Sequence, residues 1–545
     1  MGVGKEKDRD GMVSGSCSAC METRILMATM LVMGLLVLSG QFMPFGSLGT
    51  RSCDKLAQTF LREEASLRFY GVDIDTKELK EMTEAKLNAA GAGGNNDSVK
   101  EGGEAKEEEM AMAMAKLNTV DLGGNNSSVK EGREAGDEEE ASDKRVFRPY
   151  GNAAYLFVKM GAYRGGDYTF AVVGLASKPL HVFGKPGFEC EWIPKNSTLG
   201  PVKGSTYKML PDWGYGRVYT VVVVNCTFSH PVGTDGSGGE LVIYADDGSN
   251  IGKPERIVAL TERENTYNAS LFSGPPPYDY LYCGSSLYGN LSPQRMREWM
   301  AYHFKFFGPK THFVFHDAGG VHEEVRKVME PWIQTGRVTL QDIKAQEVYD
   351  GYYHNQFLIV NDCLHRYKFM AKWTFFFDVD EYLYVPRGRT LQSVLNEFSN
   401  YTQFTIEQYP MSNKLCMERN DNTTYSRDWG LEKLIFRDVK KGIRRDRKYA
   451  IQARNAYATG VHMSENIIGK SQHQTVGKIR YYHYHGTISR RDEPCKEFVK
   501  SSMRRNITWL DGTPYILDSK LRHIAGSIKK FELQQIGSQL EDTPQ

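Results

Sequence analysis

The chain has 545 residues, and its 68 lysines and arginines nearly balance its 67 aspartates and glutamates, which leaves a formal net charge of +1. A chain of this length exceeds one ordinary domain, so we expect two folded units with tethers. The absence of a basic excess argues against a nucleic-acid-binding protein.

The first predicted element is an uncleaved membrane anchor over residues 25–45, which follows a cytosolic tail over residues 1–24. The run ILMATMLVMGLLVLSGQFMPF carries no charge and is about as long as a bilayer core is thick. A cleaved signal peptide is the alternative, but it would have a shorter apolar run and a small-residue cleavage site.

N-glycosylation sequons orient this anchor, because all of them lie on its C-terminal side. Sequons and disulfide-forming cysteines both fit a lumenal or extracellular body, so we expect a single-pass type II protein. Cys53 is an odd cysteine that could join two chains into a homodimer. The sequons start at Asn96, Asn125, Asn126, Asn196, Asn225, Asn268, Asn290, Asn400, Asn422 and Asn506. The spacing of the cysteines does not show how they pair. The disulfide candidates are Cys190, Cys226, Cys283, Cys363, Cys416 and Cys495.

Residues 46–147 are predicted to be a flexible stem. The segment AKLNAAGAGGNNDSVKEGGEAKEEE from Ala85 recurs as AKLNTVDLGGNNSSVKEGREAGDEEE from Ala115, which is a 30-residue duplication. Two copies with almost no apolar face cannot bury a core, so we interpret them as a disordered spacer rather than a solenoid.

Residues 148–273 are rich in short β-branched and aromatic runs separated by glycine, proline and aspartate, which predicts a β-sandwich. The clearest strands are Tyr168–Val173, Tyr219–Val224 and Glu240–Tyr244. Trp192 and Trp213 lie in loops or edges of this unit, and they are candidates for a carbohydrate-binding platform. Ordinary core packing is the alternative for both.

Residues 274–530 alternate predicted strands and helices, and residues 531–545 are left as a C-terminal tail. This alternation with apolar strands predicts an α/β fold whose parallel sheet is covered on both faces. Ligands bind beyond the carboxyl ends of such strands, where Ser285 and Asp317 are donor-binding candidates. The predicted strands cover 280–286, 311–317, 338–340 and 373–383, and the predicted helices cover 292–307, with Ser292 as N-cap and Pro293 at its first position, and 353–366.

The acidic pair Asp378 and Asp380 follows the last of these strands in the run WTFFFDVDEYL. The residue between them faces the other way, so both carboxylates reach one rim. Carboxylate oxygens bind Mn²⁺ or Mg²⁺, and such an ion can also hold a diphosphate and offset its charge as it leaves. A solvated turn or a helix cap is the alternative for this pair.

The run IRYYHYH at 479–485 alternates like a strand and places two histidines on one face. We expect His483 to complete the metal site and His485 to contact phosphate. Residues 440–454 are densely basic, and they form either a solvated face or a patch that attracts an anionic donor or a pectic acceptor.

Three segments together resemble plant β-1,4-galactan synthases of glycosyltransferase family 92: FFFDVDEYLYVP, IRRDRKYAIQARNAYATGVHMSEN and KIRYYHYHGTIS. The likeness runs from about Arg148 to the C-terminus. It implies a Golgi-membrane enzyme with a GT-A fold and an appended carbohydrate-binding β domain. It also implies UDP-galactose as donor, manganese as cofactor and the β-1,4-galactan side chains of pectin (rhamnogalacturonan I) as acceptor. Asp378 and Asp380 match the family's metal-binding D-x-D and His483 its C-terminal histidine, whereas His485 stands where many members have arginine.

A β-linkage made from an α-linked donor requires inversion and a general base near the acceptor hydroxyl. The segment WGLEK at 429–433 resembles the W-G-x-E-D segment of inverting GT-A enzymes. Glu432 is therefore the first candidate for the base and Asp428 the second, although a structural salt bridge would explain Glu432 equally well. Two further hypotheses are a glycan-binding protein with an inactive transferase unit and a transferase for another donor, such as UDP-arabinopyranose.

Overall fold

The computed structural model describes residues 143–151, 155–177, 186–196, 198–215, 218–246, 253–349, 351–418, 428–440, 447–500 and 507–544. The predicted cytosolic tail, the anchor over 25–45 and the duplicated part of the stem lie outside these residues. Within them, no helix is both long enough and apolar enough to cross a membrane.

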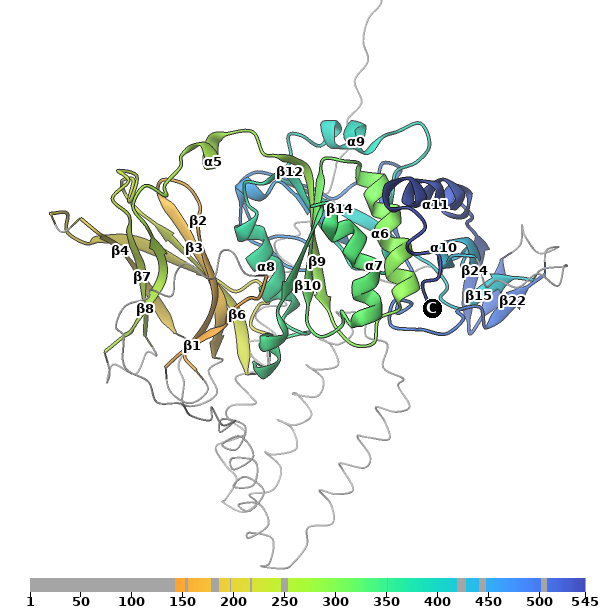
Figure 1. Cartoon of the computed structure of the whole chain (residues 1–545), viewed down its shortest axis with the longest axis horizontal. Coiled ribbons are helices and arrows are strands. Elements are labelled where there is room, and N and C mark those ends of the chain that lie inside the picture. The colour runs from red at the N-terminus through yellow and green to blue at the C-terminus, as the bar shows by residue number, and fades with distance from the viewer. Residues whose placement is uncertain are drawn as a thin grey trace, which may run out of the picture. The chain divides into compact units, whose positions relative to one another are not determined.

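The first folded unit is an eight-stranded antiparallel sheet with the strand order β1-β2-β3-β6-β5-β4-β7-β8 (Figure 1). Instead of the two separate layers of a sandwich, one continuous sheet folds over, and the buried Lys159 of β2 donates a hydrogen bond to the carbonyl of Ala259 in β8 (2.9 Å). The strands are β1 (Arg148–Tyr150), β2 (Phe157–Arg164), β3 (Thr169–Ser177), β4 (Gly187–Pro194), β5 (Val202–Met209), β6 (Tyr219–Thr227), β7 (Gly239–Asp246) and β8 (Glu255–Glu262).

Apolar side chains on alternate positions of these strands fill the inside of the folded sheet, where Phe157, Phe170 and Ile243 are fully buried. A disulfide between Cys190 and Cys226 joins β4 to β6 in this core. The other face of β3 and β6 packs against the helix α8 (Gln356–Arg366) of the second unit. The two units therefore share an apolar contact.

The second unit is built on a nine-stranded sheet whose strands β11, β10, β9 and β12 are parallel neighbours. The prediction of a parallel sheet fails beyond β12, because β17 runs antiparallel to β12 and β14, and β13 runs antiparallel to β21. Beyond β12 the sheet is mixed, since β14 runs parallel to β21 and β20 across long crossover connections. The strands are β9 (Tyr278–Leu287), β10 (Thr311–Asp317), β11 (Val338–Asp342), β12 (Ala371–Phe376), β13 (Glu381–Tyr384), β14 (Gln403–Pro410), β17 (Lys448–Ile451), β20 (Ser471–Gln472) and β21 (Arg480–His483).

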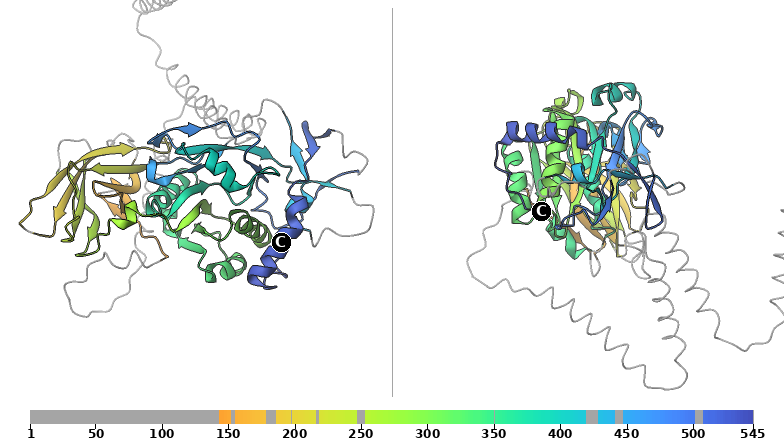
Figure 2. Two further views of the ribbon diagram at one scale, coloured as in Figure 1. Left: turned by 90° about the horizontal axis from the view of Figure 1, so that it is seen from above. Right: turned by 90° about the vertical axis from the view of Figure 1, so that its right-hand side faces the viewer.

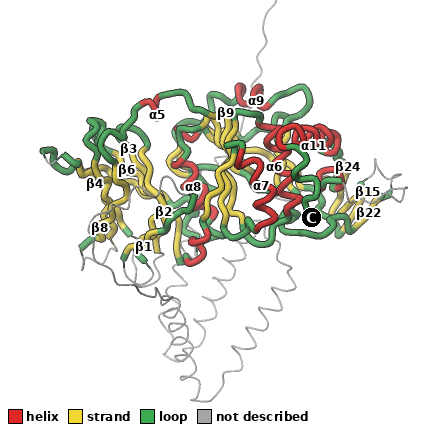
Figure 3. Tube along the Cα trace, in the orientation of Figure 1, coloured by secondary structure: helices red, strands yellow, loops and turns green. Residues whose placement is uncertain are grey.

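Helices cover both faces of the parallel part, as the sequence predicted. Tyr282 and Phe313 meet α6 and α7 on one face, whereas Leu281 and Val314 meet α8 on the other. Figure 3 shows α6, α7 and α8 alongside the strands of the second unit. The helices are α5 (Ser270–Ser273), α6 (Pro293–Phe307), α7 (Glu323–Gln334), α8, α9 (Leu391–Glu397), α10 (Gly430–Lys433) and α11 (Arg522–Ile536), with short 3₁₀ turns at Lys344–Val348 and Ala453–Asn455.

Smaller sheets and two disulfides complete the second unit. The disulfides pair Cys283 of β9 with Cys363 of α8, and Cys416 with Cys495. The remaining strands are β15 (Leu415–Met417), β16 (Phe436–Asp438), β18 (Ala456–Ala458), β19 (Asn466–Ile467), β22 (Glu497–Val499), β23 (Thr508–Leu510) and β24 (Thr513–Leu517).

Two helix starts show how local chemistry sets the element boundaries. α6 begins as predicted, because the Ser292 side chain accepts a hydrogen bond from the backbone N–H of Arg295 (3.2 Å) and Pro293 follows it. α8 begins three residues later than predicted, at Gln356. The three preceding residues, 353–355, have left-handed φ angles of 50°, 52° and 55°, which no α-helix contains.

Both outer limits of the predicted domains change. Residues 143–147 were assigned to the stem, but Arg145 is 2% exposed and its guanidinium pairs with Asp362 of α8 at 2.7 Å. Residues 531–545 were assigned to a tail, but α11 crosses residue 530, and Ile536 and Leu540 are buried in the main core. Figure 2 shows α11, in dark blue, beside the green helices that cover the sheet. Apolar residues at helical spacing past residue 530 explain this packing.

Replacing Arg145 with alanine should destabilise the protein by about 3–5 kcal/mol, because the buried Asp362 would lose the guanidinium that pairs with it at 2.7 Å. The midpoint of urea unfolding, followed by circular dichroism, measures the change. Arg256→Ala is the matched control, since it breaks an exposed pair with Glu240 and should cost less than about 1 kcal/mol. Equal midpoints for the two variants would contradict a structural role for the buried pair.

Candidate active site

The acidic pair lies in the turn between two buried strands, β12 and β13. β13 pairs with β21 in a register that places Glu381 opposite His483. This pairing brings a histidine that lies about a hundred residues further along the chain next to Asp380. The carboxyl ends of β9 and β12 are neighbours in the sheet, so the turn lies at the rim where ligands bind.

Asp380, His483 and His485 form a group that could hold a metal ion, since one ligand atom from each lies within 4.8 Å of the other two. The Asp380 carboxylate lies 3.5 Å from Nε2 of His483 and accepts a hydrogen bond from the backbone N–H of Gly486 (3.0 Å). The two imidazole rings stand perpendicular at 5.2 Å. A carboxylate oxygen with two imidazole nitrogens is a donor set that fits a divalent transition metal such as Mn²⁺.

Asp378 was predicted to share this role, but it is not part of the group of three. Its carboxylate accepts hydrogen bonds from Lys448 (2.7 Å) and from Gln356 (3.3 Å). Burial would raise the pKa of Asp378, but Lys448 and the hydroxyl of Ser285 together hold it below its usual value. Asp378 is therefore an ionised carboxylate paired with a buried lysine.

Glu381 is the third acidic side chain of this turn, and it lies beside the same lysine. It is 1% exposed, accepts a hydrogen bond from the backbone N–H of Asp378 (2.8 Å) and lies 3.8 Å from the ammonium of Lys448. Burial raises the pKa of Glu381 to about 8, because the desolvation cost outweighs the attraction of Lys448. For His483, burial would lower the pKa, but the Asp380 carboxylate outweighs burial and raises it to about 9.

Sequence reasoning did not assign Lys448, Gln356 and Gln408 to the site. Gln408 of β14 contacts Nδ1 of His483 at 2.5 Å and so orients the ring. Lys448 stood among the basic residues 440–454, and only the strand pattern after it, Tyr449 to Ile451, indicated that it is buried. Of the other basic residues there, Arg447 donates to the carbonyl of His473 (2.7 Å), and residues 441–446 lie outside the described residues.

The two donor-binding candidates at strand ends differ. Ser285 lies at the site, because its hydroxyl contacts Asp378. Asp317 has another role: its carboxylate accepts hydrogen bonds from the N–H groups of Gly319 and Val321 and pairs with Lys344 at 2.9 Å. We therefore remove Asp317 from the donor-binding set. It shapes the loop after β10.

Glu432 forms the salt bridge that was the alternative to a catalytic role. Its carboxylate pairs with Lys529 of α11 and accepts a hydrogen bond from the backbone N–H of Trp429 at the start of α10 (2.8 Å). These contacts tie α10 to α11. Asp428, the second candidate, is half-buried and directly precedes this helix.

The platform predicted from two tryptophans is wrong for Trp192. This side chain is 1% exposed and stacks on Phe170 at 5.4 Å inside the first unit, so no sugar can reach it. In the sequence, a tryptophan between Glu191 and Ile193 fits a core position and a surface position equally well. Trp213 is 46% exposed and contacts Phe357 of α8, so it remains a candidate surface residue.

Trp192→Ala should lower the free energy of unfolding by about 3–5 kcal/mol, because it leaves a cavity in a packed core. Trp213→Ala should change it by less than about 1 kcal/mol, since nearly half of that side chain is already in solvent. Denaturant titration of both variants measures the difference. A small loss of unfolding free energy for Trp192→Ala would contradict a core position for Trp192.

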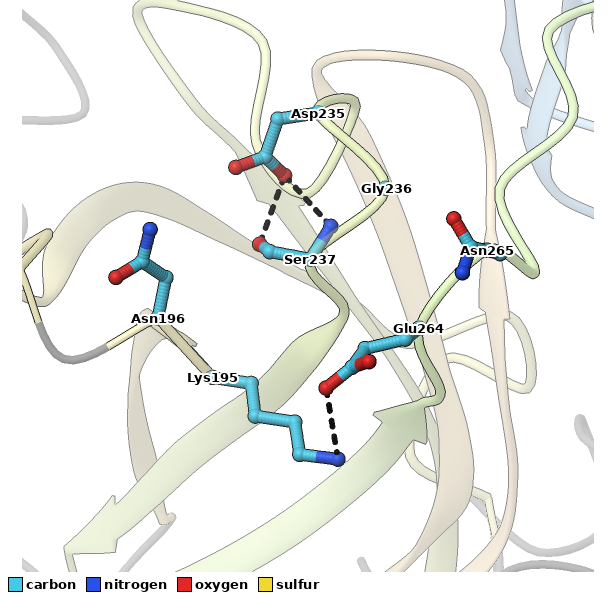
Figure 4. A pocket seen from close by; sticks show the side chains of 7 residues that line it. All are labelled: Lys195, Asn196, Asp235, Gly236, Ser237, Glu264 and Asn265. Atoms are coloured by element: carbon cyan, nitrogen blue, oxygen red, sulfur yellow. Dashed lines mark hydrogen bonds and ion pairs between the residues drawn. The ribbon is translucent and has the colours of Figure 1, made fainter.

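A cavity with a volume of about 380 Å³ lies in the first unit (Figure 4). Lys195 and Glu264 form an exposed ion pair across it (3.3 Å), and Asp235 accepts hydrogen bonds from Ser237. No aromatic side chain lines it, and none of the acid–histidine group belongs to it. We do not connect this cavity with the chemistry at Asp380.

Comparison with known proteins gives the family of the chain. The model of glycosyltransferase family 92 matches residues 278–512, which contain the acidic pair and both histidines. Galactan beta-1,4-galactosyltransferase GALS1 of Arabidopsis thaliana is 59% identical over 401 residues, covering 73% of this chain and 80% of that protein. GALS3 of the same plant is 54% identical over 408 residues, covering 74% and 80%. Beta-1,4-galactosyltransferase galt-1 of Caenorhabditis elegans is 25% identical over 220 residues, covering 38% and 49%.

The α/β sheet, the acid–histidine group at its rim and these matches define the chain as a glycosyltransferase, an enzyme that moves a sugar from a nucleotide-sugar donor to a glycan acceptor. It belongs to glycosyltransferase family 92.

Proposed function

We propose that the protein transfers galactose, with inversion, from UDP-galactose to the β-1,4-galactan side chains of pectin. The observation that carries this proposal is the 59% identity to a galactan beta-1,4-galactosyltransferase over 401 residues. The aligned span is long enough to contain both folded units. The acid–histidine group supplies the chemistry that such a transfer needs at the diphosphate.

The second unit is, in this proposal, a GT-A fold. Its support is the parallel set β11-β10-β9-β12 with helices on both faces and an acidic pair directly after β12. The first unit would bind the glycan acceptor, and the exposed Trp213 next to α8 is a candidate contact. The joint apolar contact between the units keeps such an acceptor surface fixed relative to the catalytic sheet.

In this mechanism, Asp380, His483 and His485 would hold Mn²⁺ or Mg²⁺. The bound ion would offset the charge that develops on the departing UDP. This assignment gives His485 a ligand role in place of the phosphate contact that we expected. Lys448 holds Asp378 in place, so Asp378 would accept a hydrogen bond from a donor hydroxyl rather than bind the ion. Ser285 and Gln356 support the same carboxylate.

An inverting transfer also needs a base for the acceptor hydroxyl. Glu432 and Asp428 stay the candidates, and the ion pair with Lys529 orients Glu432. The chain would act in the Golgi lumen as a single-pass type II protein, held by residues 25–45 on the stem and able to dimerise through Cys53. Three disulfides among the described residues and the sequons support an oxidising, glycosylating compartment.

Asp380→Ala should lower galactosyl transfer from UDP-galactose to a β-1,4-galacto-oligosaccharide more than about 100-fold, because the ion loses its carboxylate ligand. EDTA should have the same effect on the unchanged protein, and added Mn²⁺ should restore it. Product release measured with a panel of UDP-sugars, including UDP-arabinopyranose, checks both the reaction and the donor. Asp235→Asn, in the unrelated cavity, is the control and should keep full activity.

Full activity of Asp380→Ala with unchanged metal dependence would refute the site. Binding of galactan without turnover for any donor would instead support a glycan-binding protein with an inactive transferase unit. Preference for another UDP-sugar would keep the enzyme and change the substrate.

Glu432→Gln separates the two roles of Glu432. A general base loses its function with its charge, so kcat should fall about 100-fold or more while the unfolding midpoint stays within a few degrees. Lys529→Met removes the same ion pair and keeps the carboxylate, so it is the matched control. If the two variants lose stability alike and keep kcat, Glu432 is a structural residue only.

A further inference from the structure

Two aromatic rings stack at the rim next to the acidic pair. Tyr288 directly follows β9, His354 lies just before α8, and their ring centroids are 3.8 Å apart at 21°. Tyr288 is 37% exposed and His354 is also exposed. The pair therefore presents a flat π surface to solvent, and no step of the mechanism above uses it.

The stack depends on an unusual backbone turn. Tyr353, His354 and Asn355 have φ angles of 50°, 52° and 55°, and residues with side chains rarely adopt this left-handed region in succession. Strain of this kind persists only when surrounding contacts hold it, and it gathers at ligand-binding sites.

Hydrogen bonds on both sides hold this turn. The Asn355 side-chain amide donates to Oε1 of Gln346 (2.5 Å) and to the carbonyl of Tyr349 (3.1 Å). The hydroxyl of Ser286, at the end of β9, donates to the carbonyl of His354 (3.0 Å). The turn is thus attached directly to the strand end that carries Tyr288, which sets the two rings face to face.

The turn that carries His354 is joined to the acidic pair through the first residue of α8. Burial and the Tyr353 hydroxyl raise the pKa of Tyr288, and the carboxylates of Asp378 and Asp380 raise it further. Gln356, two residues after His354, donates to Asp378.

The topology places the stack at an edge of the sheet where ligands bind in open α/β folds. β9 has β10 on one side and β12 on the other, so the order of the parallel strands reverses at β9. In open α/β sheets, ligands enter the crevice at this switch point, beyond the carboxyl ends of the strands. Tyr288 follows β9 at that end, and the turn begins the helix on the second face.

We propose that the Tyr288–His354 stack is the platform on which the base of the nucleotide donor lies. This inference rests on the proposed function, and it adds the part of the site that recognises the nucleoside. A planar base stacks on an aromatic face whatever its hydrogen-bonding edge, and the diphosphate then extends from the platform toward Asp380. A sugar ring of the acceptor is the other possible occupant, but the switch point and the acidic pair favour the nucleotide.

Binding of UDP to the full-length protein in the presence of Mn²⁺, measured by calorimetry, tests the platform. Tyr288→Ala should weaken UDP binding about 5- to 100-fold, as the loss of one aromatic–base stack does. Binding of inorganic pyrophosphate with Mn²⁺ should stay unchanged, since pyrophosphate has no base. Tyr288→Phe should bind UDP within about twofold of the unchanged protein.

His354→Asn is the second variant, because asparagine tolerates the left-handed region and lacks the aromatic face. It should fold normally and still lose UDP affinity. Tyr207→Ala is the control, since this exposed tyrosine lies on β5 of the first unit.

The outcomes separate this inference from the function on which it rests. If the unchanged protein binds no UDP, the proposed function fails. If it binds UDP and both platform variants bind UDP equally well, the platform is overturned. If those variants keep UDP affinity and instead raise KM for the galacto-oligosaccharide, the stack holds the acceptor and the platform is likewise overturned.

Discussion

The register of β13 against β21 is the constraint on which the candidate site depends. Glu381 faces His483 in this pairing, so Asp380 meets an imidazole from a distant part of the chain. Side chains alternate along a strand, so a slip by one residue would turn His483 to the opposite face of the sheet and remove it from the group. Tyr481 and Tyr482, both fully buried, pin the register from within the core.

The buried ammonium of Lys448 stabilises the acid-rich turn between β12 and β13. Asp378 and Glu381 both lie near Lys448, which is itself almost inaccessible to solvent. Buried carboxylates without a partner would be costly or would take up protons. Lys448 comes from β17, which runs antiparallel to its neighbours. Its positive charge therefore stabilises a carboxylate that follows the parallel strand β12.

The sequence predicted those features that follow from local chemistry. Ser292 and Pro293 indicated the start of α6. The strand predicted over 311–317 has the same bounds as β10. It did not reveal that β17 and β13 run antiparallel, because strand direction depends on connections and not on side chains. The start of α8 was also missed, since nothing in Tyr353 and His354 as residue types signals a left-handed backbone. Asp378 and Asp380 look equivalent in the sequence, but in the structure Asp378 pairs with Lys448 and Asp380 lies beside His483.

The covalent bond between Cys283 and Cys363 ties β9 to α8, the two elements that flank the rim where the sheet order reverses. Such a link removes many conformations from the unfolded chain, and it also fixes the spacing of the two elements once folded. Correct assembly of the catalytic unit is thus coupled to the redox state of the compartment in which the chain matures. A chain made where thiols stay reduced would have every ligand atom in its sequence and would lack the covalent tether between β9 and α8.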